Sequence, residues 1–305
     1  MTNQDNTNGV HISLEELIRY CWQAPGLTLA SRKQVLTTMG GIHHSGFRGH
    51  GIDFLETRRY QPGDDIRTID WRVTARFKKT HTKVFCEERE RPVFFLVDYG
   101  PQMFFGTQKA FKSVVAARAV ALLACAAKDQ GDRVGGLIFS PEPKNFRQLR
   151  PEGGQRGVSH LLQAMVDGTS MQNSVFREDY MDSALIRLQR IAHPGSLIFI
   201  FSDFQAMGTN TEQRLSQLAR HNHIVGVFIY DRLEPELPPP GLYDISDGKQ
   251  ALTINSADSQ LCQRYQTQFN QRRTYITTFF QQRRLQLLSL ATDDSVCDVL
   301  QHSFT

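Results

Sequence analysis

The sequence predicts an α/β protein built on a mostly parallel sheet flanked by helices. Strands are predicted at residues 93–98, 133–139, 196–202, 223–230 and 285–291, and the five consecutive apolar residues at 93–97 are typical of a strand buried on both faces. Longer segments with an apolar stripe of helical period lie between them, the first at about 108–129. Strands that alternate with helices favour a parallel sheet, so we expect these five strands to lie in one sheet.

The chain before the first of these strands is predicted to form two further parts. Residues 1–40 are expected to be an N-terminal tail and helices, because Ser13 and Glu16 form a capping box ahead of an apolar stripe. Residues 41–92 are expected to be a charged β/loop extension packed on the core. Eleven Lys or Arg stand against eight Asp or Glu between residues 43 and 91, so most charges there can find a partner. Residues 93–305 are expected to be the sheet domain.

Further elements of the sheet domain follow from the same patterns. Helices are predicted at about 156–166, 181–192, 211–221 and 257–284, and a last short helix follows residue 292. Residues 146–150 indicate a short edge strand. A hairpin is predicted after Gly241, with Asp247-Gly248 as its turn. The domain therefore ends in a helix, a strand and a helix.

Composition narrows the classes of function. The five cysteines show no CxxC pairing, which favours a reducing compartment over a disulfide framework. The N-terminus is polar, and no apolar run approaches the ~20 residues of a membrane span. We therefore expect a cytoplasmic protein. The net charge of +4 requires no nucleic-acid or membrane partner, and neither GxGxxG nor GxxxxGK[ST] is found, so no nucleotide site is predicted.

Two aspartates mark a candidate site. Asp98 follows the first predicted strand, and Ser202-Asp203 follows the strand near residue 200. Ligands of open α/β sheets bind beyond the carboxyl ends of the strands. We expect both carboxylates to project from the same edge of the sheet, although Asp98 also fits a purely local role in capping its turn.

A second candidate lies in the charged segment. Acids and bases alternate there around a Tyr and a Trp, and guanidinium groups can pair with carboxylates and stack on aromatic rings. The pattern favours a salt-bridged platform or a partner-docking face over a phosphate-binding patch, because the acids offset the positive field. The residues are Arg58, Arg59, Tyr60, Asp64, Asp65, Arg67, Asp70, Trp71 and Arg76.

We expect this platform to be structural. Asp70 and Arg76 are predicted to take part in pairing, with Trp71 as an apolar anchor. Loss of either charge should then lower stability, and the double mutant should lose less than the sum.

These residues resemble a known family. The run Arg58-Arg59-Tyr60-x-Pro62-Gly63-Asp64-Asp65-x-Arg67-x-Ile69-Asp70-Trp71-x-x-Thr74-Ala75-Arg76 resembles the signature of the bacterial family called domain of unknown function 58. Later blocks at 97–98, 131–135 and 200–204 match that family in order, so the resemblance spans roughly residues 40–305. The family is similar to von Willebrand factor A domains, which implies a Rossmann-like fold.

The resemblance also implies a metal-ion-dependent adhesion site in degenerate form. Its ligand positions correspond to Asp98, Gln102, Thr169, Ser202 and Asp203, while Gly100 stands where a serine ligand is usual. Oxygen ligands of this kind suit Mg²⁺. With both usual serines replaced, we expect weak Mg²⁺ binding or none, and we expect serine at positions 100 and 102 to strengthen it.

The function implied by the resemblance is that of a non-enzymatic, chaperone-like adaptor. Members of the family are typically encoded beside MoxR-type AAA+ ATPases, which implies such an ATPase and a client protein as partners. Two alternatives stay open. One is a metal-dependent hydrolase using Asp98 and Asp203, and the other is a nucleic-acid-binding protein, which the mixed charges disfavour.

Overall fold

The structure is a computed structural model that describes residues 9–29, 52–62, 64–87, 90–169, 175–236, 238–246 and 251–304. The chain divides into two compact units. The sheet unit consists of residues 1–32 and 91–305, and the signature unit consists of residues 33–90. Residues 9–29 thus belong to the same unit as the sheet, and each unit is described below by itself.

The sheet unit is built on a six-stranded sheet with the order β10-β7-β6-β3-β4-β5. The five predicted strands are confirmed, and they are parallel to one another. The edge strand β5 pairs antiparallel with β4. The strands are β3 (Pro92–Asp98), β4 (Arg133–Phe139), β5 (Arg147–Glu152), β6 (Leu197–Ser202), β7 (His223–Tyr230) and β10 (Gln286–Ala291).

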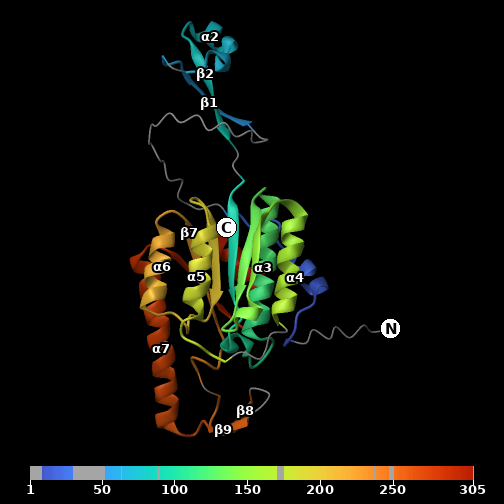
Figure 1. The fold of residues 1–305 in the computed structure, drawn as a ribbon, viewed down its shortest axis with the longest axis vertical. Helices are drawn as coiled ribbons and strands as arrows, with labels where there is room; N and C mark the ends of the chain where they lie inside the picture. The colour runs from blue at the N-terminus through green and yellow to red at the C-terminus, as the bar shows by residue number, and fades with distance from the viewer. Residues whose placement is uncertain are drawn as a thin grey trace, which may run out of the picture. The chain divides into compact units, whose positions relative to one another are not determined.

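Helices cover both faces of this sheet (Figure 1). On one face, α1 (Leu14–Cys21), α3 (Lys112–Asp129), α4 (Gly154–Thr169) and α8 (Val296–Phe304) contribute to one buried core. On the other face, α5 (Tyr180–Ile191), α6 (Thr209–Ala219) and α7 (Ser259–Gln282) contribute to a second. Strand β3 supplies both cores, because Phe95 and Val97 point to the first and Phe94 and Leu96 to the second. A mixed α/β fold with a mostly parallel sheet is therefore confirmed.

The first helix is attached to α3 by a covalent link. Ser13 caps α1 as predicted, and its side chain accepts a hydrogen bond from the backbone N–H of Glu16. Cys21 at the end of α1 is joined to Cys125 of α3 by a disulfide. The expectation of unpaired cysteines is therefore wrong. The sequence lacked the signal because the two cysteines lie 104 residues apart and meet only when α1 packs on α3.

The signature unit contains a two-stranded antiparallel sheet. Strand β1 (Ile52–Arg59) pairs with β2 (His81–Glu87), with an irregular register between Phe54 and Glu56. Between the strands lie the 3-10 turn η1 (Ile66–Thr68) and the short helix α2 (Trp71–Phe77), which the sequence patterns did not predict. Whether this unit packs on the sheet unit stays a prediction.

A small hairpin of β8 (Leu242–Ser246) and β9 (Ala251–Asn255) follows β7, as predicted. Its expected turn residues, Asp247 and Gly248, lie outside the described residues. Across the part of the chain that the structure describes, no helix is long and apolar enough to cross a bilayer.

Candidate functional site

The two aspartates meet at one edge of the sheet, as predicted. Asp98 is the last residue of β3, and Asp203 directly follows β6. Because β3 and β6 are parallel neighbours, their carboxyl ends lie side by side. Both carboxylates are buried. The site is therefore an interior cluster beneath the carboxyl edge.

Asp98 is held by four hydrogen bonds of 3.0 Å or less. Tyr180 of α5 donates its hydroxyl to Oδ1 at 3.0 Å and to Oδ2 at 2.9 Å. The Ser202 hydroxyl donates to Oδ2 at 2.6 Å, and the Gly100 backbone N–H donates to Oδ1 at 2.7 Å. The hydrogen bond from Gly100 is the local capping contact that the sequence allowed for Asp98. Tyr180 and Ser202, which are distant in sequence, bind the same carboxylate.

This environment favours the protonated form of Asp98. Burial, and then the nearby charge of Asp203, raise the pKa of Asp98 to about 7, although the hydrogen bonds from Ser202, Gly100 and Tyr180 oppose the rise. Asp98 is therefore expected to titrate near neutral pH.

Asp203 is paired with a buried lysine. Lys112, the first residue of α3, places its Nζ 3.0 Å from Asp203 Oδ2 and 2.6 Å from Glu234 Oε1. The lysine side chain is only 1% exposed, so solvent screens these pairs weakly. Burial alone would lower the pKa of Lys112, but the charges of Asp203 and Glu234 outweigh it and raise that pKa above its usual value. An ammonium group is thus fixed between two carboxylates.

Arg272 of α7 completes a neutral set of charges. Its Nη2 lies 3.0 Å from Glu234 Oε2, on the opposite side of the carboxylate from Lys112. Two cations, Lys112 and Arg272, therefore stand against two carboxylates, Asp203 and Glu234. Removing one member of a buried pair leaves the other charge uncompensated and typically costs about 3–5 kcal/mol.

The remaining predicted metal positions lie apart from this network. Gln102 lies in the 3-10 turn η2 (Pro101–Phe104), and its Oε1 is buried without a partner in the described protein. Thr169 ends α4 and is not in a loop. Its hydroxyl donates to the Val166 carbonyl at 2.8 Å, while its own carbonyl lies 3.3 Å from His11 Nδ1.

These donors do not fit Mg²⁺. The ion requires a near-octahedral shell of oxygens, but Asp98 is saturated by Tyr180 and Ser202, and Asp203 is neutralised by Lys112. A Cβ atom at Gly100 would overlap the Tyr180 hydroxyl, so the serine expected to restore a ligand there requires Tyr180 to move. Within the described ranges, no group of three or more His, Cys, Asp or Glu side chains is placed to hold a metal.

The signature unit uses its acids differently from the prediction. Arg58 pairs with Asp64 at 2.7 Å, and Asp64 also accepts the Gln61 backbone N–H. Asp65 instead caps η1 through the Arg67 backbone N–H at 2.9 Å. The backbone N–H of Tyr60 donates to the Thr80 carbonyl, and Arg59 accepts from Arg58 through its carbonyl. The acids thus serve mainly as caps.

Two further expectations for this unit are wrong. Asp70 does not pair with Arg76. It caps α2 by accepting the backbone N–H groups of Arg72 and Val73 at 3.1 Å, and its nearest cation is Lys83 at 4.0 Å. Trp71 is no buried anchor, because 68% of it is exposed. The physical reason is the short helix α2, which requires a capping acid and turns Trp71 outward.

The signature unit exposes both large apolar side chains and arginines. Ile66 and Phe77 are 66% and 62% exposed. Arg67, Arg72 and Arg76 are also exposed, and their guanidinium groups make no ion pair with any residue the structure describes. We call these three arginines together with Ile66, Trp71 and Phe77 the Trp71 surface.

The sequence analysis missed four residues of the buried network: Lys112, Tyr180, Glu234 and Arg272. A signal existed for Lys112, which stands close before the apolar run from Val114 to Ala117 at the start of α3. Nothing comparable marked Glu234 or Arg272, which lie 122 and 160 residues further along the chain.

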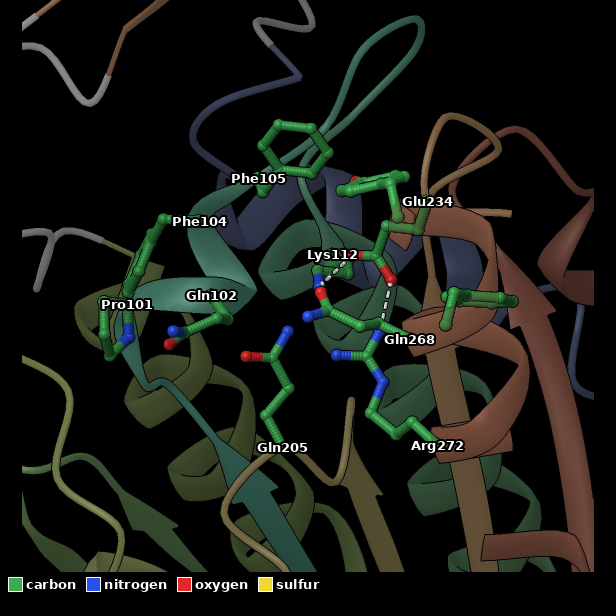
Figure 2. Close-up of a pocket in the computed structure, with 11 residues that line it drawn as sticks. Pro101, Gln102, Phe104, Phe105, Lys112, Gln205, Glu234, Gln268 and Arg272 are labelled. Carbon is green, nitrogen blue, oxygen red and sulfur yellow. Dashed lines mark hydrogen bonds and ion pairs between the residues drawn. The ribbon is translucent and has the colours of Figure 1, made fainter. Parts of the chain in front are cut away.

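A cavity of about 490 Å³ opens above the network. Figure 2 shows the side chains of Gln205 and Arg272 pointing toward each other, with the Gln102 amide directed toward Pro101 and the Lys112–Glu234–Arg272 chain of ion pairs along one wall. Its lining residues are Pro101, Gln102, Phe104, Phe105, Lys112, Gln205, Glu234, Tyr265, Gln268, Phe269 and Arg272. The wall is thus part aromatic and part amide.

Comparison with known proteins identifies relatives of unknown function. Residues 56–275 match the family described as "Protein of unknown function DUF58". An uncharacterized protein of Mycobacterium tuberculosis, Rv1480, is 26% identical over 226 residues, which cover 74% of this chain and 70% of the relative. The uncharacterized protein YeaD of Bacillus subtilis is 26% identical over 151 residues, or 48% of this chain and 35% of that protein.

Two solved structures resemble the chain with lower sequence identity than these relatives. The conserved hypothetical protein BatB of Bacteroides thetaiotaomicron has a TM-score of 0.42 at 12% identity, and an aerotolerance-related membrane protein of Bacteroides fragilis has 0.43 at 13%. Each alignment covers 70% of this chain and 96% of the other. The cytoplasmic location predicted from the sequence is not upheld, since one of these proteins is described as a membrane protein. The prediction rested on the lack of an apolar span, and that lack leaves other forms of membrane attachment open.

Proposed function

Because the chain belongs to the DUF58 family, whose function is unknown, we propose that it is a non-enzymatic adaptor that works with a MoxR-type AAA+ ATPase. In this role it would present a client protein to the ATPase for maturation, assembly or remodelling. The proposal commits to two kinds of contact, one with the ATPase and one with the client.

The observation that carries the proposal is the Trp71 surface. Exposed aromatic and arginine side chains are the residue types most enriched at the centres of protein interfaces. Trp71 is 68% exposed and stands beside arginines without an ion-pair partner in the described residues. We propose that this surface docks an acidic, partly apolar face of the ATPase.

The sheet edge supports a binding role over a catalytic one. A metal-dependent hydrolase would require Asp98 and Asp203 to be free for a metal or a water. Instead Asp203 holds Lys112, and Asp98 accepts from Tyr180 and Ser202. We further propose that the chain is related to von Willebrand factor A domains. In this chain, the ammonium group of Lys112 would take the place that a metal cation has in those domains.

The proposal is tested by direct binding. The full-length chain is immobilised, and the MoxR-type ATPase from the same genome is titrated in the presence of ATP. We expect Trp71→Ala to weaken binding at least tenfold. Trp22→Ala is the matched control, because Trp22 is 75% exposed in the sheet unit and is expected to bind like the wild type. Equal effects of the two variants, or no binding by the wild type, would refute the proposal.

A second candidate function follows from the same surface. The mixed charges of the sequence disfavoured nucleic acid, and the capping carboxylates Asp65 and Asp70 keep their negative charge, but both are held at the backbone and, within the described residues, form no ion pair with Arg67, Arg72 or Arg76. Cations beside an exposed Trp suit single-stranded nucleic acid. The discriminating measurement is the salt dependence of binding to a single-stranded oligonucleotide. A steep negative slope of log K against log salt that is reduced in Arg72→Ala would favour this candidate.

A further inference from the structure

We infer that the cavity at the carboxyl edge of the sheet is a binding site for a short, uncharged peptide segment. The inference deepens the proposed function and rests on it in one respect, since the segment would belong to the client protein. Three features of the cavity support this occupant: its balanced charges, its unpaired polar atoms and its aromatic wall (Figure 2).

The charges of the cavity are already matched by one another. Lys112 is shared by Asp203 and Glu234, and Glu234 is shared by Lys112 and Arg272. These two cations and two carboxylates sum to zero. A charged ligand would introduce an uncompensated charge beside a buried network, which is unfavourable. The cavity therefore selects against acidic and basic groups.

Two polar atoms of the lining require partners of opposite kinds. Gln102 Oε1 is a buried acceptor and Arg272 Nε is a buried donor, and neither has a hydrogen-bond partner in the described protein. Buried polar groups are nearly always paired, and leaving one unpaired is costly. Both atoms are shielded from solvent, so a ligand reaches them only when the two side chains turn toward the cavity, and a ligand that then satisfies both must bring one donor and one acceptor. A peptide group carries one N–H and one C=O.

The rest of the wall suits the side chains of such a segment. Phe104, Phe105, Tyr265 and Phe269 supply aromatic surface, and Gln205 and Gln268 add further amides. The volume of about 490 Å³ lies within the range of ligand pockets in proteins, which is about 300–1,000 Å³. An apolar or amide side chain can pack on the rings while the backbone bonds to Gln102 and Arg272. The occupant is therefore an extended segment with uncharged side chains.

The site can be tested without the ATPase. The probes are fluorescein-labelled hexapeptides whose C-termini are amidated and whose central pair is Phe-Gln, Leu-Phe, Asp-Asp or Lys-Lys, and binding to the full-length chain is followed by fluorescence anisotropy. We expect the uncharged peptides to bind and the Asp-Asp and Lys-Lys peptides to bind at least tenfold more weakly.

Three variants distinguish binding in the cavity from non-specific binding of the peptides elsewhere on the protein. Gln102→Leu removes an acceptor that has no partner in the described protein, so it is expected to keep or raise the melting temperature and to weaken peptide binding about tenfold. Gln205→Trp is expected to fill the cavity and abolish binding. Gln281→Leu, on the exposed surface of α7, is the matched control and is expected to bind like the wild type.

The outcomes distinguish this inference from the proposed function. Failure of every uncharged peptide to bind at 1 mM (about −4 kcal/mol), or tighter binding of the Asp-Asp peptide, would overturn the site even if the ATPase binds. Equal binding by Gln102→Leu and the wild type would overturn it as well. If the peptides bind as expected but the ATPase does not, the peptide site stands and the proposed function falls.

Discussion

At the scale of the residue, one buried lysine decides the character of the sheet edge. Lys112 fills the space between Asp203 and Glu234 with a permanent positive charge. The charges of both carboxylates are thereby balanced inside the protein. The neighbouring Asp98 lacks such a cation and depends on hydrogen bonds alone, which leaves it sensitive to pH.

The pH sensitivity of Asp98 leads to the first prediction. Its pKa is raised from 3.8 to about 7 in the folded chain. Below pH 4 the carboxyl is protonated in both the folded and the unfolded state. As the pH rises from about 4 to about 7, the unfolded state loses the proton first, so the folded state becomes less stable. The loss is on the order of a few kcal/mol and is complete above pH 7.

Asp98→Asn is expected to remove this contribution. Urea unfolding at pH values between 4 and 8.5 should show that wild-type stability falls relative to that of the variant, with the difference levelling off above pH 7. Asp167→Asn, which alters an exposed carboxylate on α4, is expected to keep the wild-type profile. Parallel profiles of Asp98→Asn and the wild type would show that Asp98 stays ionised in the fold.

At the scale of the element, α2 depends on a cap and not on an ion pair between Asp70 and Arg76. The side chain of Asp70 accepts two backbone N–H groups in the first turn of the helix. Such caps contribute about 1 kcal/mol. Arg76 is exposed on the same helix and makes no ion pair with a described residue. The two charges therefore act independently.

The second prediction separates these roles. Asp70→Ala is expected to speed amide hydrogen exchange across residues 71–77 about fivefold, because losing the cap destabilises α2 by about 1 kcal/mol. Asp70→Asn keeps an acceptor and should exchange nearly like the wild type. Arg76→Ala is expected to leave exchange unchanged. An effect of Arg76→Ala as large as that of Asp70→Ala would restore the original salt-bridge interpretation.

At the scale of the whole molecule, the signature unit is an insertion between two parts of the sheet unit. The chain leaves the sheet unit near residue 32 and returns at residue 91. The two sides of the insertion lie close together, because Arg91 Nη2 donates to the Leu29 carbonyl at 3.3 Å. Arg91 is fixed there by Asp132 at 3.0 Å.

The third prediction is that the sheet unit folds without the insertion. Replacing residues 33–90 with six Gly or Ser residues, whose mean span is roughly 13 Å, is expected to give a cooperative unfolding transition and to retain the Cys21–Cys125 disulfide. Adding Arg91→Ala to the shortened chain should lower its stability, because the Asp132 charge and the Leu29 carbonyl lose a partner. A shortened chain that aggregates or unfolds without cooperativity would show that the sheet unit requires the signature unit.

The sequence by itself determined the sheet. Five apolar-rich runs predicted five strands, of which β3, β4, β6 and β7 lie inside the sheet and are buried along most of their length, whereas the edge strand β10 is partly exposed. The sequence also placed Asp98 and Asp203 at one edge of the sheet, because each follows a parallel strand and parallel strands end on the same side. The cap at Ser13 was equally visible, because its bond to Glu16 joins near neighbours. These features depend on local pattern and on the regular geometry of parallel strands.

Only the tertiary structure decided what the two aspartates do. Lys112, Tyr180 and Glu234 lie on helices and a loop outside the strands that carry the two aspartates. The periodicity of a helix predicts which of its faces is buried, but it does not predict which strand end a given side chain will contact. The Cys21–Cys125 disulfide is hidden for the same reason. In the signature unit, alternating charges suggested ion pairs, but the backbone N–H groups of two short helical turns bind Asp65 and Asp70 instead. Unpaired backbone donors at a helix start compete with arginines for a carboxylate, and three-dimensional position determines the outcome.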